Sequence, residues 1–138
     1  MSVNAPPDKR AQAEALTAAL NARDFDALAD MPFDPAVELR SLIAAAEGGV
    51  YYGIQGIRNW AESVDSIFDD FRLELVDFRE VDDHRASLGV QLKAKAKTSG
   101  LPVDARVGQV WTWRKGLMWR NDIYRDYREA LEAVGLGE

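Results

Sequence analysis

The chain of 138 residues has the length of one domain, and its 47% apolar and 29% charged residues are the balance of a globular protein. It contains no cysteine, which excludes disulfides, thiolate nucleophiles and iron–sulfur sites. A net charge of -6 argues against broad binding to the phosphate backbone of nucleic acids, and no apolar run approaches the roughly 20 residues of a membrane span.

The N-terminal part predicts two helices. Residues 1–8 contain two prolines and are predicted to be disordered, ahead of a single domain over residues 9–138. The N-terminus has no apolar signal core, so the sequence predicts a cytoplasmic protein without membrane contact. Asp8 can cap a helix that runs to about Arg23, and Asp24 can cap a second, short helix.

The middle of the chain predicts a strand and the clearest helix. The segment "AVELRSLI", residues 36–43, alternates as a strand does. A glycine turn and a short strand follow it. Apolar residues then recur at helical spacing and form one stripe, made of Ile57, Trp60, Ala61, Val64, Ile67 and Phe68.

The last part of the chain predicts four antiparallel strands, over residues 71–81, 85–97, 102–113 and 117–123. A change of parity near Leu75 predicts a β-bulge, and Gly89 and Gly108 would help the sheet to curve. The fold class is therefore α+β, with N-terminal helices and a strongly bent, cone-shaped, mostly antiparallel sheet wrapped around the long amphipathic helix. Such a cone leaves a cavity between sheet and helix.

Strand alternation selects the residues that face this cavity. On the last strand, Trp119 and Ile123 predict an inward Asn121, which leaves Asp122 on the opposite face. Gln109 lies on the apolar face of the preceding strand, and Trp111 and Trp119 are the predicted aromatic wall. The two amides either bond each other or a water, or they contact a ligand.

Glu38 and Arg40 are the other candidate pair, and they share one face of their strand. Simple alternation points Val37 and Leu39 to the core and this pair to solvent. If the pair instead faces the cavity, Glu38 is the candidate general base and Arg40 the group that binds an oxyanion or carboxylate.

No metal or cofactor is predicted. The single histidine, His84, lies in the polar turn "VDDHR", which is typical of a surface residue, and a metal site usually needs three or four placed ligands. The sequence contains no phosphate-binding loop and no dinucleotide fingerprint.

Two segments carry a family resemblance, "YYGIQGIRNW" before the long helix and "KGLMWRNDIYRDYREALEAVGL" at the end. With this order of elements, the chain resembles the SnoaL-like polyketide cyclase group of the nuclear transport factor two-like superfamily. The superfamily includes isomerases, cyclases, dehydratases, epoxide hydrolases and many non-catalytic binding modules. The resemblance implies a homodimer formed through the outer face of the sheet.

The resemblance also bears on single positions. Ile123 matches the position of the catalytic aspartate of limonene-type epoxide hydrolases, and Val90 and Leu92 match their arginine and second aspartate. An isoleucine cannot take a proton, so that mechanism is excluded and the three aliphatic residues become candidate ligand contacts. The same comparison places Glu38 and Arg40 in the pocket.

Three hypotheses for function remain open. The first is a protein whose conical cavity binds a small hydrophobic molecule, with isomerase, cyclase or lyase chemistry by proton transfer and without a cofactor. The second is a non-catalytic ligand-binding or protein-interaction module, which the missing acid at Ile123 favours. In the third, the chain's own side chains fill the pocket and serve stability alone.

Overall fold

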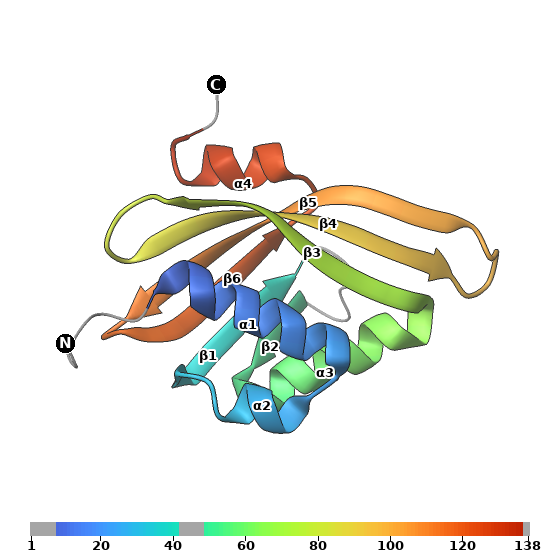
Figure 1. Cartoon of the computed structure of the whole chain (residues 1–138), viewed down its shortest axis with the longest axis horizontal. Coiled ribbons are helices and arrows are strands. Elements are labelled where there is room, and N and C mark those ends of the chain that lie inside the picture. The colour runs from blue at the N-terminus through green and yellow to red at the C-terminus, as the bar shows by residue number, and fades with distance from the viewer. Residues whose placement is uncertain (1–7, 42–48, 137–138) are drawn as a thin grey trace.

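The computed structural model describes residues 8–41 and 49–136. These residues form four helices and six strands (Figure 1), which in chain order are α1 (Lys9–Ala22), α2 (Phe25–Ala29), β1 (Phe33–Ser41), β2 (Val50–Tyr52), α3 (Gly53–Ile67), β3 (Phe68–Glu80), β4 (Arg85–Ala96), β5 (Pro102–Arg114), β6 (Leu117–Tyr124) and α4 (Tyr127–Ala133). Of the residues predicted to be disordered, 1–8, all but Asp8 lie outside the described residues, and Asp8 is the N-cap of α1. The last two residues of the predicted strand 36–43 also lie outside the described residues.

Side-chain caps start the first two helices, as predicted. The Asp8 carboxylate accepts a hydrogen bond from the backbone N–H of Arg10 at 2.9 Å. Asp24 accepts one from the N–H of Ala27 at 3.0 Å. Each bond satisfies a donor that the first helical turn would otherwise leave unpaired. The chain reverses between the two helices at Arg23, which has the left-handed conformation with φ of 55°.

The strands form one six-stranded sheet in the order β2-β1-β6-β5-β4-β3. All neighbours are antiparallel except β1 and β6, which are parallel. The register of β3 shifts between Leu75 and Asp77, which confirms the predicted bulge, and a second shift lies between Asp69 and Arg72. Bulges increase local bending and twist, so both shifts help this long strand to curve.

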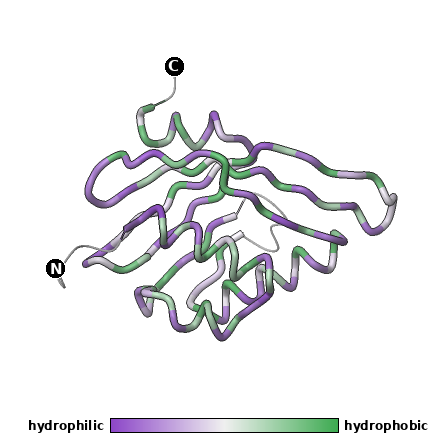
Figure 2. The backbone as a smooth tube through the Cα atoms, viewed as in Figure 1, coloured by the Kyte–Doolittle hydropathy of each residue, from purple (hydrophilic) through white to green (hydrophobic). Residues whose placement is uncertain are grey.

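Helices α1 and α3 lie against one face of the sheet, and α4 lies on the other (Figure 1). Hydrophilic and hydrophobic residues alternate along the long strands, as expected for a sheet with one face on a core (Figure 2). The predicted stripe of α3 is buried at Ile57, Trp60, Ala61 and Val64. It ends there, because Ile67 is 43% exposed and Phe68 already begins β3.

Two paired glycines let α4 approach the outer face of the sheet. Gly89 and Gly108 are Cα partners on β4 and β5. A Cβ on Gly108 would lie 2.6 Å from the Ala130 Cβ, and one on Gly89 would lie 3.0 Å from the Tyr127 ring. The Tyr127 hydroxyl donates to the Asp77 carboxylate. Burial and this hydrogen bond raise the pKa of Tyr127 to about 12, and the same bond lowers the pKa of Asp77.

Candidate functional site

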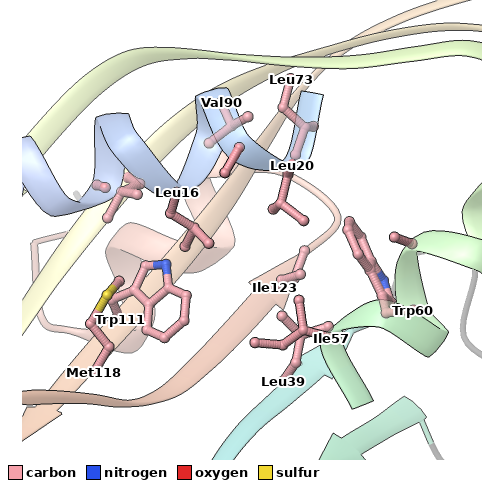
Figure 3. Packing of buried hydrophobic residues seen from close by; sticks show 14 of the residues in the cluster. Leu16, Leu20, Leu39, Ile57, Trp60, Leu73, Val90, Trp111, Met118 and Ile123 are labelled. Atoms are coloured by element: carbon pink, nitrogen blue, oxygen red, sulfur yellow. The ribbon is translucent and has the colours of Figure 1, made fainter. Parts of the chain in front are cut away.

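A small cavity lies between the helices and the inner face of the sheet. It leaves about 10 Å³ for the centre of a water molecule, which is close to the minimum that one water needs. Helix α1 covers it, α3 closes one side and the strands form its floor (Figure 3). The described residues that line it are Ala13, Leu16, Thr17, Leu20, Leu39, Ile57, Trp60, Leu73, Leu88, Gln109, Trp111, Asn121 and Ile123.

The polar atoms of the cavity gather on β5 and β6. Asn121 is 2% exposed and Gln109 is 8% exposed. The Asn121 Nδ2 donates to the Gln109 Oε1 at 3.3 Å, so the two amides bond each other. The Asn121 Oδ1 and the Trp111 Nε1 have no hydrogen-bond partner, and neither does the Trp60 Nε1. Because an unpaired buried polar atom keeps its full desolvation cost, the cavity holds groups that would bind a water or a ligand.

Three side-chain links hold α1 over the cavity. The Asn21 amide donates to the backbone oxygen of Leu73 at 2.7 Å and accepts from its N–H at 2.9 Å. The Trp113 Nε1 donates to the Gln12 Oε1 at 2.8 Å near the other end of the helix. Arg23 forms a two-bond ion pair with Asp65 of α3, at 2.9 and 2.5 Å. The hydrogen bond from Arg23 lowers the pKa of Asp65.

Four predicted residues line the cavity, namely Gln109, Trp111, Asn121 and Ile123. Val90 and Leu92 are buried on the same face of β4 but are not among the lining residues. Leu88 lines the cavity in their place, because it is the Cα partner of Gln109, whereas Val90 and Leu92 pair with β5 farther toward the β4–β5 turn.

Trp119 was predicted to line the cavity, and the structure places it on the outer face. The register between β5 and β6 shifts at this point: Thr112 pairs with Arg120, but the next residue, Trp113, pairs with Met118. Trp119 is therefore an extra, unpaired residue on β6. Its ring lies 4.4 Å from the Arg114 guanidinium carbon. Met118 takes the inward position and is fully buried.

The structure also corrects the inward placement of Glu38 and Arg40. Val37 and Leu39 are buried, so the pair lies on the opposite, outer face of β1 and does not line the cavity. The Arg40 Nε lies 3.1 Å from the Glu38 Oε1. On β6, the Arg120 Nε lies 3.0 Å from the Asp122 Oδ2. Because Glu38 pairs with Arg120 and Arg40 with Asp122 across the strands, the four residues form an outer charged patch of alternating sign.

The chemistry open to the cavity is narrow. None of the described residues that line it carries an ionisable side chain. The part of the chain that the structure describes holds no group of three or more His, Asp or Glu residues that could bind a metal ion. Within those same residues, no helix is long and apolar enough to cross a membrane.

Sequence reasoning missed most of the apolar lining, which comes from α1, α3 and neighbouring strands. Leu16 and Leu20 form part of the apolar stripe of α1, and Ile57 and Trp60 form part of that of α3. Both stripes were visible in the sequence. The helical spacing alone did not indicate which residues of each stripe line the cavity and which are fully packed.

Many solved structures are similar in fold, and three of them serve as examples. A Burkholderia pseudomallei protein described as NTF2-like and of unknown function has a TM-score of 0.72 at 16% identity, covering 91% of this chain and 96% of that one. A Catenulispora acidiphila protein with a ketosteroid isomerase-like fold, in complex with trimethylamine, has a TM-score of 0.70 at 15% identity, covering 91% and 92%. A Mycobacterium tuberculosis protein in complex with estradiol-17β-hemisuccinate has a TM-score of 0.65 at 12% identity, covering 83% and 90%.

At such low identity these likenesses show the fold alone, and they confirm the predicted fold class. No protein of curated function matches the sequence. The sequence does match a family, described as SnoaL-like domain, over residues 13–121. This range includes α1 from Ala13 onward, all of α3, and the cavity residues Gln109, Trp111 and Asn121. The chain therefore belongs to the SnoaL-like domain family.

Proposed function

We propose that this chain binds a small, largely hydrophobic molecule in the cavity beneath α1. The observation that carries the proposal is a set of three unpaired polar atoms, the Asn121 Oδ1, the Trp111 Nε1 and the Trp60 Nε1, on residues that line an otherwise largely apolar cavity. Ligand pockets are typically apolar with a few placed polar groups that orient the ligand. Related folds that hold trimethylamine or a steroid hemisuccinate support a small-molecule role for this interior.

Binding would require the cavity to open. Its present volume of about 10 Å³ suits one water and no larger molecule. Helix α1 is the most direct element to move, because Leu16 and Leu20 point from it into the cavity, Leu16 toward Trp111 (Figure 3). The proposal therefore includes a displacement of α1 on ligand entry.

A non-catalytic binding module fits this cavity better than proton-transfer chemistry. A general acid or base must lie within hydrogen-bond reach of the reacting group, at roughly 2.6–3.2 Å. The described lining residues offer apolar, amide, hydroxyl and indole groups, none of which titrates near neutral pH. Glu38, the candidate base, lies on the other face of the sheet.

A catalytic role for Glu38 and Arg40 is a second candidate, at the outer face. Arg40 lines a separate pocket of about 270 Å³ together with Asp122 and Tyr124, and Glu38 is ion-paired to Arg40. If this pocket is catalytic, Glu38→Gln and Arg40→Met should abolish turnover of a substrate while stability stays unchanged. If both variants leave every ligand response intact, the pair has no role in the reaction.

We also propose a homodimer through the outer charged patch. Helix α4 covers the outer face of β4 and β5, which leaves the part over β1 and β6 uncovered by it (Figure 1). The alternating signs of the patch allow two copies related by a twofold axis to place cations against anions.

The binding proposal is tested by thermal shift with a panel of small hydrophobic ketones, alcohols and aromatic compounds. A ligand at about 100 times its dissociation constant adds roughly 2.7 kcal/mol, which raises the melting temperature by several degrees at this chain length. The shift should disappear in Ile123→Phe, which fills the cavity, and should persist in Trp119→Phe on the outer face. No shift from any compound would contradict the proposal and favour an interior filled by the chain itself.

A further inference from the structure

We infer that the cavity selects an uncharged ligand whose polar group both donates and accepts a hydrogen bond, as a hydroxyl does. The inference rests on the proposed function and names the chemical class that the same site takes. It follows from two of the unpaired polar atoms, the Asn121 Oδ1 and the Trp111 Nε1, from their position on neighbouring strands, and from the absence of ionisable groups from the described lining.

The two unpaired atoms have opposite requirements. The Asn121 amide uses its Nδ2 on Gln109, which leaves its Oδ1 as a free acceptor. An indole Nε1 can only donate, so Trp111 offers a free donor. Both side chains are at least 98% buried, at 2% and 1% exposure, so bulk water does not satisfy them.

One polar group can reach both atoms. Trp111 and Asn121 are direct Cα partners on β5 and β6, and both face the cavity. Directly opposed residues have their Cβ atoms about 4.5–5.5 Å apart. In Figure 3 the Trp111 nitrogen lies on the side of the ring that faces Leu16, which is the space beneath α1. A hydroxyl there accepts from Trp111 and donates to Asn121.

Other functional groups leave part of the site unsatisfied. A ketone accepts from Trp111 but cannot donate to the Asn121 Oδ1. A hydrocarbon pairs with neither atom. A carboxylate or ammonium would lose its hydration without gaining a counter-ion from the described lining, which is the costliest case.

The site has the size and the polar groups to hold a single water, which a ligand would have to replace. The free volume and the two unpaired atoms match the needs of one buried water. Displacing a well-ordered water weakens binding unless the ligand reproduces its hydrogen bonds. A hydroxyl can form the same two hydrogen bonds as the water, one as donor and one as acceptor. The rest of the ligand would occupy the space opened when α1 moves.

The test uses five compounds built on one six-membered carbon ring: cyclohexanol, cyclohexanone, methylcyclohexane, cyclohexanecarboxylate and cyclohexylamine. Dissociation constants are measured by NMR titration of the full chain at pH 7. Cyclohexanol should bind more tightly than the ketone and the hydrocarbon, and the two charged compounds should not bind. Asn121→Leu should weaken cyclohexanol about tenfold and bring it level with cyclohexanone, because the acceptor is lost while the Trp111 donor remains. Trp119→Phe, on the outer face, should leave the order unchanged.

The outcomes separate the inference from the proposal beneath it. If ring compounds bind but the ketone, the hydrocarbon or a charged compound binds as tightly as cyclohexanol, the inference is overturned while the cavity remains a binding site. If none of the five compounds binds up to its solubility limit, both the proposed function and the inference are contradicted. The ranking in the unmodified chain is informative even if Asn121→Leu does not fold.

Discussion

The Leu20 side chain occupies space beneath α1 that a ligand would need. It lines the cavity and is 8% exposed. We expect Leu20→Ala to lower the free energy of unfolding by about 2–5 kcal/mol, because it removes buried methyl groups and leaves a void. The same void should tighten the binding of cyclohexanol. Urea denaturation and NMR titration measure the two effects.

Leu28→Ala is the matched control for this prediction. Leu28 is 1% exposed on α2 and is not among the lining residues. It should lose a similar amount of stability without any gain in affinity. Equal affinity gains in both variants would mean that loosening of the fold, and not cavity volume, admits the compound.

Single side chains mark the limit of what strand alternation can predict. Alternation placed Gln109, Asn121 and Ile123 correctly, because regular pairing surrounds each of them. It failed at Trp119, where a bulge adds one residue to β6. Because Met118 and Trp119 are both apolar, the sequence did not indicate which of the two faces inward. For Glu38, alternation alone gave the observed outer placement, and the comparison with epoxide hydrolases pointed the wrong way.

At the scale of elements, the ion pair between α1 and α3 makes stability depend on pH. The hydrogen bond from Arg23 lowers the pKa of Asp65 below its ordinary value of 3.8. A depressed folded-state pKa stabilises the fold above the unfolded value, and this contribution is lost as the pH falls through the folded value. The difference in melting temperature between the natural chain and Asp65→Asn should therefore be constant from pH 5 to 7 and shrink below about pH 4.

Asp26→Asn provides the same change of charge on the neighbouring helix α2. Asp26 lies in the first turn of that helix and has no ion pair with Arg23. The melting temperature of the Asp26→Asn variant should follow that of the natural chain across the acid range more closely than that of Asp65→Asn does. If Asp65→Asn showed the same acid-dependent loss as the natural chain, the Arg23 pair would contribute nothing to stability.

The close packing of α4 against Gly108 predicts a second change in stability. We expect Gly108→Ala to destabilise the chain by roughly 1–3 kcal/mol, because the new methyl group overlaps the Ala130 Cβ and the Tyr127 backbone. Hydrogen exchange of the α4 amides should accelerate in the same variant. Urea denaturation and exchange measured by mass spectrometry check both effects.

A double variant isolates the contact. Gly108→Ala combined with Ala130→Gly removes one of the two colliding methyl groups, so its loss should be smaller than the sum of the two single losses. Strict additivity would mean that the glycine acts through backbone freedom and not through the close approach of α4.

The helices and strands could be predicted from the sequence better than the way in which they pack against one another. Caps at Asp8 and Asp24 and the stripe of α3 follow from local rules, and each appears in the structure. The glycines of β4 and β5 were interpreted as aids to curvature, although they also admit α4. A glycine within a strand has several explanations, and only the packed neighbour decides among them.

For the whole molecule, the outer charged patch predicts how two copies meet. We expect Arg120→Glu to shift the chain toward monomer in sedimentation experiments, because it places a negative charge beside Glu38 and removes the partner of Asp122. High salt should act in the same direction. Arg106→Glu makes the same change of charge on β5 away from the patch and should leave the assembly intact. A natural chain that sediments as a monomer at all concentrations would contradict the dimer.

The parallel pairing of β1 with β6 also sets an order of events during synthesis. Residues 33–41 find their β6 partner only after residues 117–124 have left the ribosome. At about 5–20 residues per second, that interval is roughly 4–17 seconds. Until then β1 has only β2 beside it, so its β6-facing edge keeps unpaired backbone N–H and C=O groups. The β6-facing edge of β1 is therefore the part of the nascent sheet that stays open to pairing with other strands.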